Sequence, residues 1–263
     1  MTEWRLIDSG PCPAAYNMAL DEAIATEVRR ERVPPTLRFY GWEIPSVSLG
    51  SFQKISDVDL RYCADNNIPV VRRPTGGRAI LHGDELTYSF SAASGGLFPG
   101  GLLDTYRQLS LALRSALCLL GADITMKTER ESGKVLTRSP LCFKSTSYGE
   151  LSFHGRKLIG SAQRRWKDGF LQQGSIPYTL DERDTAKIFA LAPAAATREG
   201  MVGLREVLPS LDPAKLKEAI RTAFEKTFVI SLLRLDLSPE ELHLARELES
   251  RKYRTPQRNL RQD

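Results

Sequence analysis

The spacing of hydrophobic positions along the chain predicts several amphipathic helices. The clearest covers residues 102–120, where apolar side chains recur every three to four positions and Gly121 stands at the end. A second is expected over residues 14–30, whose apolar stripe repeats every four residues. Three more are expected, at residues 57–66 with Ser56 as N-cap, after Asp212-Pro213, and after the capping box that begins at Ser238.

Short apolar runs between these helices predict strands. Alternation is clearest in residues 85–91, which we expect to form a meander with residues 78–82. A hairpin is expected over residues 150–165 with its turn at Gly155-Arg156. The remaining strands are expected at residues 4–8, followed by a turn at 9–11, and at 36–40, 46–50, 69–73 and 170–177. Because hairpins are mixed with helices, the expected fold class is α/β (α+β), a mixed β-sheet with packed helices.

Length and composition fit a globular chain. With 263 residues, 41% of them hydrophobic, the protein is long enough to bury a full core. We expect a main domain over residues 1–210 and a C-terminal helical extension with a basic tail over residues 211–263. No apolar stretch approaches the roughly 18 residues of a membrane span, and no leader segment is evident. The expected location is therefore cytoplasmic, with no membrane partner.

The net charge of +5 is concentrated at one end. Residues 251–263 carry five basic groups and one acidic group, so residues 1–250 have a net charge of only +1. We expect this tail to be frayed. The other local excess of positive charge falls on two glycine-containing segments, which suits an acidic protein partner better than nucleic acid. The basic residues on these two segments are Arg72, Arg73, Arg78, Arg156, Lys157, Arg164 and Arg165.

The first segment with candidate chemistry is RRPTGGRAILHGDELTYSF, residues 72–90. Adjacent glycines, Gly76 and Gly77 after Thr75, let a backbone approach a ligand closely and point its amides at a carbonyl or phosphate oxygen. An isolated Gly-Gly pair is more often an ordinary tight turn. The flanking cationic groups favour a binding site, although no nucleotide-binding glycine motif is present. These groups are Arg72, Arg73, Arg78 and His82.

The second segment is GRKLIGSAQRR, residues 155–165. Gly160, Ser161 and Ala162 leave room for a bound chain, and Lys157 lies just before them. A lysine at this place can pair with a carbonyl oxygen or a thiolate, but most lysines are solvated surface cations.

The third segment contains one of four cysteines that are too far apart for a zinc knuckle or a redox pair. Cys142 follows a charged stretch, residues 127–139, that we expect to be a mobile loop. A nucleophilic role would require a lowered pKa, which a nearby Lys or Arg can supply. Cys63 and Cys118 are better explained as small helix or core residues, and Cys12 has no cationic segment beside it. No metal site is expected.

Together these segments resemble the biotin/lipoate ligase and lipoyl-transferase superfamily. Within it, they are most similar to the cysteine-dependent bacterial octanoyl-[acyl carrier protein]:protein octanoyltransferases. The resemblance covers roughly residues 3–180 and rests on an ordered set of motifs. These are WRLIDSG and NMALDEA in residues 4–23, RFYGW at 38–42, RRPTGGR with LH and ELTYS at 72–89, Cys142-Phe143, and GRKLIGSAQ with GSI at 155–176.

The resemblance implies an acyltransferase whose catalytic domain is residues 1–210. Octanoyl would pass from octanoyl-acyl carrier protein to a thioester on Cys142, and then to a lysine of a lipoyl domain such as the glycine cleavage H protein. Lys157 would lower the pKa of Cys142 or polarise the thioester, and no cofactor or ATP would be needed. Substrate binding is assigned to Arg72, Arg73, Thr75, Gly76, Gly77, Arg78, His82, Gly160, Ser161 and Ala162. The expected state is a monomer.

One position departs from the family pattern. Where the family usually has a histidine before Gly-Ser-Ile, this chain has Gln173, which cannot act as a general base. A proton-transfer role there would pass to Lys157 or His82.

Other functions fit parts of the same pattern. An ATP-dependent lipoate ligase is disfavoured because such ligases commonly carry an accessory domain, and only about 80 residues follow residue 180. An octanoyl amidotransferase between lipoyl domains would use the same cysteine. A non-catalytic binding protein, including a nucleic-acid binder, would not need Cys142.

Overall fold

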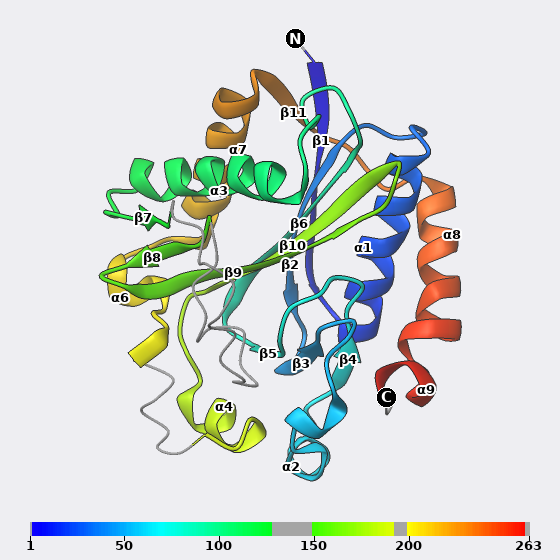
Figure 1. Ribbon diagram of the computed structural model, residues 1–263, viewed down its shortest axis with the longest axis vertical. Coiled ribbons are helices and arrows are strands. Elements are labelled where there is room, and N and C mark those ends of the chain that lie inside the picture. Colours follow the sequence, from blue (N-terminus) through cyan, green and yellow to red (C-terminus); the bar gives the residue numbers. More distant parts are fainter. Residues whose placement is uncertain (1, 128–148, 192–198, 261–263) are drawn as a thin grey trace.

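A computed structural model describes residues 2–127, 149–191 and 199–260. Its centre is an eight-stranded mixed sheet with the strand order β11-β1-β2-β6-β10-β9-β8-β7 (Figure 1). β1 pairs in parallel with β11 and β2, and the pairs from β2 to β7 are antiparallel. The strands are β1 (Thr2–Cys12), β2 (Thr36–Trp42), β6 (Glu85–Ala93), β7 (Thr125–Met126), β8 (Leu151–Phe153), β9 (Arg156–Arg165), β10 (Gly169–Pro177) and β11 (Ile230–Arg234).

A second, three-stranded sheet lies beside one end of the first. Its central strand is β3 (Ser46–Leu49), which pairs in parallel with β4 (Val70–Arg72) and antiparallel with β5 (Ile80–His82). Its own small core includes Val47, Leu49 and Cys63. Because β5 belongs to this sheet and β6 to the large one, the expected meander over residues 78–91 is wrong.

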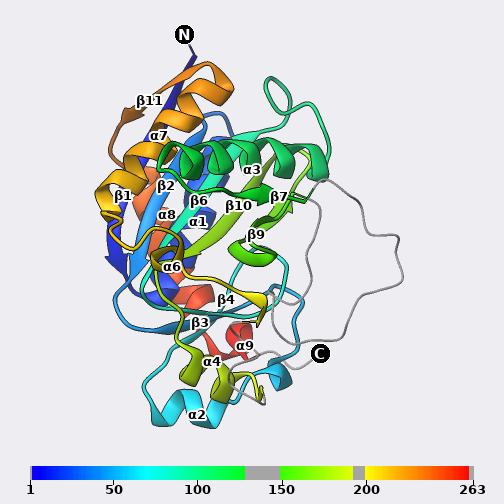
Figure 2. The same ribbon diagram turned by 90° about the vertical axis from the view of Figure 1, so that its left-hand side faces the viewer.

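Helices cover both faces of the large sheet, giving three layers (Figures 1 and 2). α3 (Leu102–Leu119) and α7 (Pro213–Phe228) pack on one face, over an aromatic core that contains Trp4, Phe90 and Phe224. α1 (Ala14–Arg29) and α8 (Pro239–Leu248) cover the other face. The shorter helices are η1 (Ile55–Asp57), α2 (Leu60–Asp65), α4 (Glu182–Ile188), α6 (Leu204–Val207), η2 (Glu249–Tyr253) and α9 (Pro256–Asn259).

The four long helices agree with the sequence expectations. In α3 the predicted stripe is buried and Gly121 follows with a φ of +90°, as a helix stop requires. α8 begins with the expected capping box, in which Ser238 and Glu241 bond each other's backbone amides. The predicted fold class, a mixed sheet with packed helices, is confirmed.

Several local expectations are wrong, each for a local reason. β1 does not turn at residues 9–11 but continues through an irregularity, where Gly10 has a φ of +63°. The helix expected over residues 57–66 starts later, because Asp59 rather than Ser56 accepts the capping bond, from the Tyr62 amide. The hairpin turns at His154-Gly155, both with positive φ. Cys118, by contrast, is a helix residue as expected, and it lies on the exposed side of α3.

The C-terminal segment is packed against the fold up to residue 260, so the expectation of a frayed tail is wrong for that part. Tyr253 is 1% exposed, and its hydroxyl donates to Glu22 of α1. α9 contacts β4, where the Asn259 side chain accepts from the Arg72 amide at 3.0 Å. The domain boundary expected near residue 210 stays a prediction, although the residues after it supply β11 to the large sheet.

Candidate active site

A narrow slot lies between the small sheet and strands β9 and β10 of the large sheet. The space between its walls is about 360 Å³ including open solvent, and the walls are mainly apolar and small side chains. Five of the residues predicted to bind substrate line it: Arg73, His82, Gly160, Ser161 and Ala162. The structure therefore brings the first and second candidate segments together, although about 80 residues separate them in the sequence.

The width of the slot depends on residues without bulky side chains on two neighbouring strands. Gly174 of β10 pairs with Ser161 of β9. A Cβ atom at Gly174 would lie 2.2 Å from the ring of Tyr88 and 2.8 Å from the Ser161 hydroxyl. The predicted Gly-Ser-Ala patch thus forms one wall of the slot.

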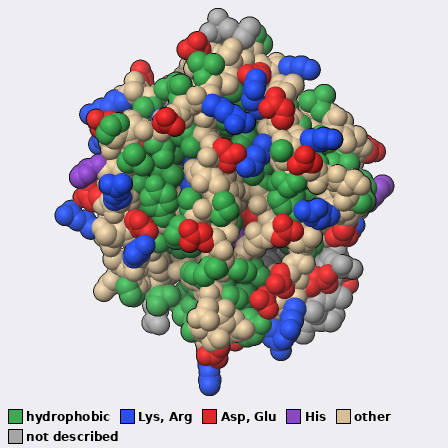
Figure 3. All heavy atoms as spheres, turned by 180° about the vertical axis from the view of Figure 1, so that it is seen from behind, with side chains coloured by type: hydrophobic (Ala, Val, Ile, Leu, Met, Phe, Trp, Pro, Cys, Tyr) green, Lys and Arg blue, Asp and Glu red, His purple; other side chains and the backbone are tan. Residues whose placement is uncertain are grey.

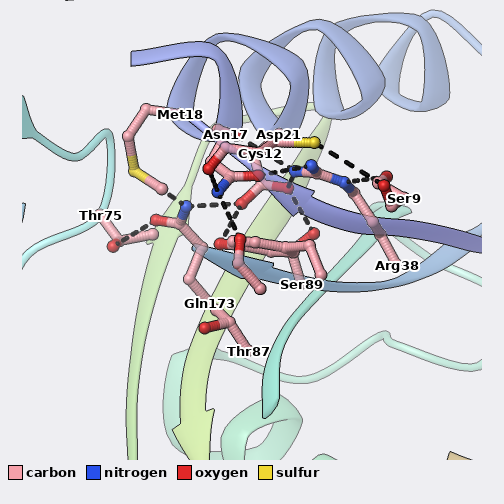
Figure 4. A network of polar contacts seen from close by, with 12 residues as sticks. Ser9, Cys12, Asn17, Met18, Asp21, Arg38, Thr75, Thr87, Ser89 and Gln173 are labelled. Carbon is pink, nitrogen blue, oxygen red and sulfur yellow. Dashed lines mark hydrogen bonds and ion pairs between the residues drawn. The ribbon is translucent and has the colours of Figure 1, made fainter. Parts of the chain in front are cut away.

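A buried polar network supports the slot from the side of α1 (Figure 4). Its centre is Asp21, which is fully buried and accepts from Arg38, Tyr40, Ser89 and Gln173 at 2.7–2.9 Å. The Arg38 guanidinium balances its charge. The same guanidinium donates to the Asn17 and Ser9 side chains. A fully bonded network of this kind fixes the strands and the helix in one arrangement.

Gln173 connects this network to the glycine turn. Its side chain donates to Asp21 at 2.7 Å and accepts from the Thr75 hydroxyl at 2.8 Å (Figure 4). Thr75 is itself fully buried behind the turn rather than in the slot lining. The residue that departs from the family pattern therefore holds the Thr75-Gly76-Gly77 turn against α1.

The two arginines before this turn bond to the protein's own backbone. Arg73 donates to the carbonyls of Ser48, Gly76 and Arg78 at 2.7–3.1 Å. Arg72 donates to the carbonyls of Gly50 and Gln53, at 2.9 and 2.6 Å, and to that of Arg258 at 3.2 Å. Both side chains are buried, which favours a role in shaping the pocket over contact with a carrier protein, and their part in substrate binding stays a prediction.

The remaining members of the turn are more accessible. Gly76 and Arg78 are half-buried, and Gly77 is exposed with a φ of +84°. The carbonyl of Gly77 packs on Gly50, where a Cβ atom would lie only 1.8 Å from it. Gly50 is therefore a site-supporting residue that the sequence analysis did not identify.

His82 is held on three sides at the mouth of the slot. Its Nδ1 lies 2.9 Å from Glu85 Oε1, its Nε2 lies 2.8 Å from Ser48 Oγ, and its ring stacks on Trp42 at 4.0 Å. Glu85 also accepts from Ser175 at 2.8 Å and from Thr87. Burial by itself would raise the pKa of Glu85, but the charge of His82 and these hydrogen bonds outweigh it and hold the pKa below the usual value.

Lys157 is buried and is therefore not one of the solvated surface cations that most lysines are. It is 1% exposed, and its ammonium group pairs with the carboxylate of Glu150, which is also buried. Cys142 lies outside the described residues, as does the charged loop over residues 128–139. The contact expected between Cys142 and Lys157 stays a prediction.

Among the other thiols, Cys63 has its pKa raised to about 11, mainly by burial, and is a poor nucleophile at neutral pH.

Several slot residues were missed as site residues. Tyr40 and Trp42 belong to the RFYGW motif that supports the family resemblance, but a motif does not show which of its side chains face a cavity. No sequence pattern marks three other slot residues, because they face the slot only once the small sheet packs against the large one. These residues are Ser48, Ile80 and Ser175.

A larger groove opens directly beside the slot. It encloses about 1200 Å³ including open solvent and shares Ile80, His82 and Ser175 with the slot. Its charged lining is mostly acidic, with Asp84, Asp181 and Glu182 against Arg183. On the face of the molecule seen in Figure 3, by contrast, basic and acidic side chains are interspersed and neither forms a continuous patch.

Two features are absent from the described ranges. No group of three or more His, Cys, Asp or Glu side chains in them is placed to hold a metal ion. Every helix in the same ranges is too short or too polar to cross a lipid bilayer.

Comparison with known proteins identifies the family. The family described as the lipoyl protein ligase A/B catalytic domain matches residues 13–225. The chain therefore belongs to this family. Within it, the chain groups with octanoyltransferases, which are acyltransferases. Octanoyltransferase LipM of Anoxybacillus flavithermus is 37% identical and that of Bacillus subtilis 36%, each match covering 98% of both chains.

Solved structures show the same fold. A crystal structure of lipoate-protein ligase A bound with ATP is 25% identical, with a TM-score of 0.85 over 98% of this chain and 99% of that one. A bipartite lipoate protein ligase from Thermoplasma acidophilum, described with its E2 lipoyl domain, is 25% identical with a TM-score of 0.81. That match covers 99% of this chain and 97% of the other. The recognised superfamily and the ligase-like catalytic fold are thus confirmed.

Proposed function

We propose that this octanoyltransferase moves octanoyl from octanoyl-acyl carrier protein to a lipoyl domain through a thioester on Cys142. The observation that carries the proposal is the slot between the small sheet and strands β9 and β10, whose small-residue wall suits a saturated chain. The full-length similarity to octanoyltransferases supports the choice of acyl group. Lipoyl domains as acceptors agree with the ligase described with its E2 lipoyl domain.

Two transfers complete the reaction. Cys142 releases its thiol proton and the thiolate attacks the thioester carbonyl. The bond to the carrier's phosphopantetheine sulfur breaks, and that sulfur leaves as a thiolate that takes up the released proton. Exchange of one thioester for another changes the free energy little, so no ATP is required. In the second transfer a lysine amine attacks the Cys142 thioester, a C–N bond forms and the thiolate leaves. Forming an amide from a thioester drives the sequence forward.

Lys157 has the role of a buried cation in this scheme. Its charge, held beside Glu150, favours the thiolate form of Cys142 or polarises the thioester carbonyl. We further propose that the enzyme is a monomer and that the glycine cleavage H protein is an acceptor. The proposed location is the cytoplasm, where thiols stay reduced.

The test is to incubate the full chain with octanoyl-loaded carrier protein in the absence of ATP and to locate the acyl group by mass spectrometry. Octanoyl is expected on Cys142, and a Cys142→Ala variant should lose transfer by at least about 100-fold, because loss of a catalytic nucleophile costs at least that much. Cys118→Ser, which alters an exposed thiol on α3, is the matched control and should leave the rate unchanged. Undiminished transfer by Cys142→Ala would exclude the covalent route.

The fold match to an ATP-bound ligase makes ATP-dependent ligation the alternative to test. Free lipoate with ATP, offered in place of the loaded carrier, should give no lipoylated acceptor. Efficient ligation under those conditions would favour the alternative.

A further inference from the structure

Three leucine side chains are exposed on the stretch that joins β6 to α3. Leu97, Leu102 and Leu103 are 46%, 44% and 38% exposed, although the same stretch sends Phe98 into the aromatic core of the large sheet. The loop rises above the start of α3 (Figure 2). Single exposed leucines are common on protein surfaces, whereas a group of them marks a site of contact with another molecule.

This stretch is tied to the strand that walls the slot. Tyr106, one turn after Leu102 on α3, donates from its hydroxyl to the Ser161 carbonyl of β9 at 3.4 Å. Arg165, also on β9, donates to the Gly100 carbonyl at 3.1 Å. Ser161 is part of the slot lining. The exposed leucines are therefore held beside the slot rather than on a remote part of the surface.

The charged side chains around the leucines are mostly basic. Residues 94–107 and 164–168, all of them described by the structure, contain four basic groups and two acidic ones. One of the two acidic groups forms an ion pair with Arg29. The local charge is therefore positive. The basic residues are Arg107, Arg164, Arg165 and Lys167, and the acidic ones are Asp104 and Asp168.

Two of these basic side chains are exposed beside the leucines. Arg107 follows Leu103 by one helical turn, so the two lie on the same side of α3. Lys167 is on the turn between β9 and β10, and the carbonyl of the next residue accepts from the Ser94 amide, at the start of the loop, at 3.0 Å. The surface thus combines apolar and positive groups. We call it the leucine patch, consisting of Leu97, Leu102, Leu103, Arg107 and Lys167.

We propose that the leucine patch is the docking surface for the acidic carrier protein that delivers octanoyl. This inference rests on the proposed function. The donor carries a phosphodiester on its pantetheine arm as well as an acidic protein surface, and a positive patch attracts both. The acceptor instead presents a cationic lysine, which the same patch repels. An apolar centre with basic residues at its rim is also the usual composition of a protein–protein interface.

The test compares two donors that carry the same thioester. The full chain is loaded with octanoyl from the carrier protein or from octanoyl-pantetheine, which lacks both the protein and the phosphate. Adduct formation on Cys142 is followed by mass spectrometry. A double variant, Arg107→Glu with Lys167→Glu, should lower the second-order rate constant for loading from the carrier by about tenfold. Loading from octanoyl-pantetheine should be unchanged, which also shows that the variant is folded.

The apolar part of the patch is tested without a change of charge. Leu103→Ser should slow loading from the carrier by about fivefold and leave loading from octanoyl-pantetheine unchanged. Leu119→Ser, at the other end of α3, and Arg61→Glu, on α2, are the matched controls. Both replace exposed side chains and should affect neither donor. Added salt should slow loading from the carrier in the unmodified enzyme more than in the charge-reversed one.

Four outcomes would overturn this docking surface. Unchanged loading from the carrier in both patch variants, or equal slowing with octanoyl-pantetheine, would show that the carrier does not dock there. Slower transfer to the lipoyl domain, with loading unchanged, would make that domain the occupant. A dimer that Leu103→Ser dissociates, measured by analytical ultracentrifugation, would make the patch a contact between two copies of this chain. An unmodified enzyme that forms no adduct on Cys142 from either donor would instead refute the proposed function.

Discussion

At the scale of single residues, the most consequential side chain outside the slot is Asp21. It accepts four hydrogen bonds and balances Arg38 inside a fully buried network. An Asp21→Asn variant removes the charge and leaves the guanidinium uncompensated. The free energy of unfolding should fall by about 3–5 kcal/mol, measured by urea denaturation. Asp168→Asn, in a partly exposed pair with Arg29, is the control and should cost at most about 1 kcal/mol. A similar loss of unfolding free energy in both variants would contradict the prediction that the buried ion pair stabilises the fold more than the partly exposed one.

The sequence predicts residues of the slot wall where a motif coincides with that wall, and their part in substrate binding stays a prediction. Gly160, Ser161, Ala162, Arg73 and His82 were found in this way. It could not show that Arg72 faces away from the slot, because an arginine at the end of a strand looks the same whether it binds a ligand or a backbone carbonyl. The role of Gln173 was equally hidden, since its two partners come from distant parts of the chain.

At the scale of elements, the glycine turn is positioned by a second turn packed on it. A Gly50→Ala variant would place a methyl group 1.8 Å from the Gly77 carbonyl, so one of the two backbones must move. We expect a loss of about 1–3 kcal/mol in stability, together with slower loading of Cys142 with octanoyl. Thermal unfolding and the mass-spectrometric assay would measure these effects.

Gly83→Ala is the matched control for this variant. A Cβ atom at Gly83 would meet nothing within 4 Å, and its stability should be close to that of the unmodified protein. If Gly50→Ala were as stable and as active as Gly83→Ala, the close packing of the two turns would not matter for the site.

Long elements were predicted better than short ones. α3 and α8 carry a complete helical stripe or a capping box, which are properties of their own sequence. β5 and β6 have similar local patterns but belong to different sheets, and this depends on partners elsewhere in the chain. The start of α2 was misplaced because both Ser56 and Asp59 are competent caps.

At the scale of the whole molecule, the C-terminal segment supports the glycine turn through Asn259. Its side chain accepts from the amide of Arg72, which is 187 residues away in the sequence, and donates to the Tyr253 carbonyl. An Asn259→Ala variant leaves a buried amide without its partner and should cost about 1–3 kcal/mol in urea denaturation. Asn66→Ala, which loses an exposed hydrogen bond, should cost much less. Equal costs would show that the segment packs without supporting β4.

The pairing of β1 with β11 has a consequence for how the protein is made. Thr2–Leu6 of the first strand align with Ile230–Arg234, and Arg5 pairs with Glu241 in α8. During synthesis, one hydrogen-bonding edge of β1 therefore stays unpaired until β11 has left the ribosome, when nearly the whole chain has been made. Exposed strand edges promote association with other chains. Protection of this edge by chaperones, or slow translation of the last helices, should therefore affect the yield of folded enzyme more than changes near the middle of the chain.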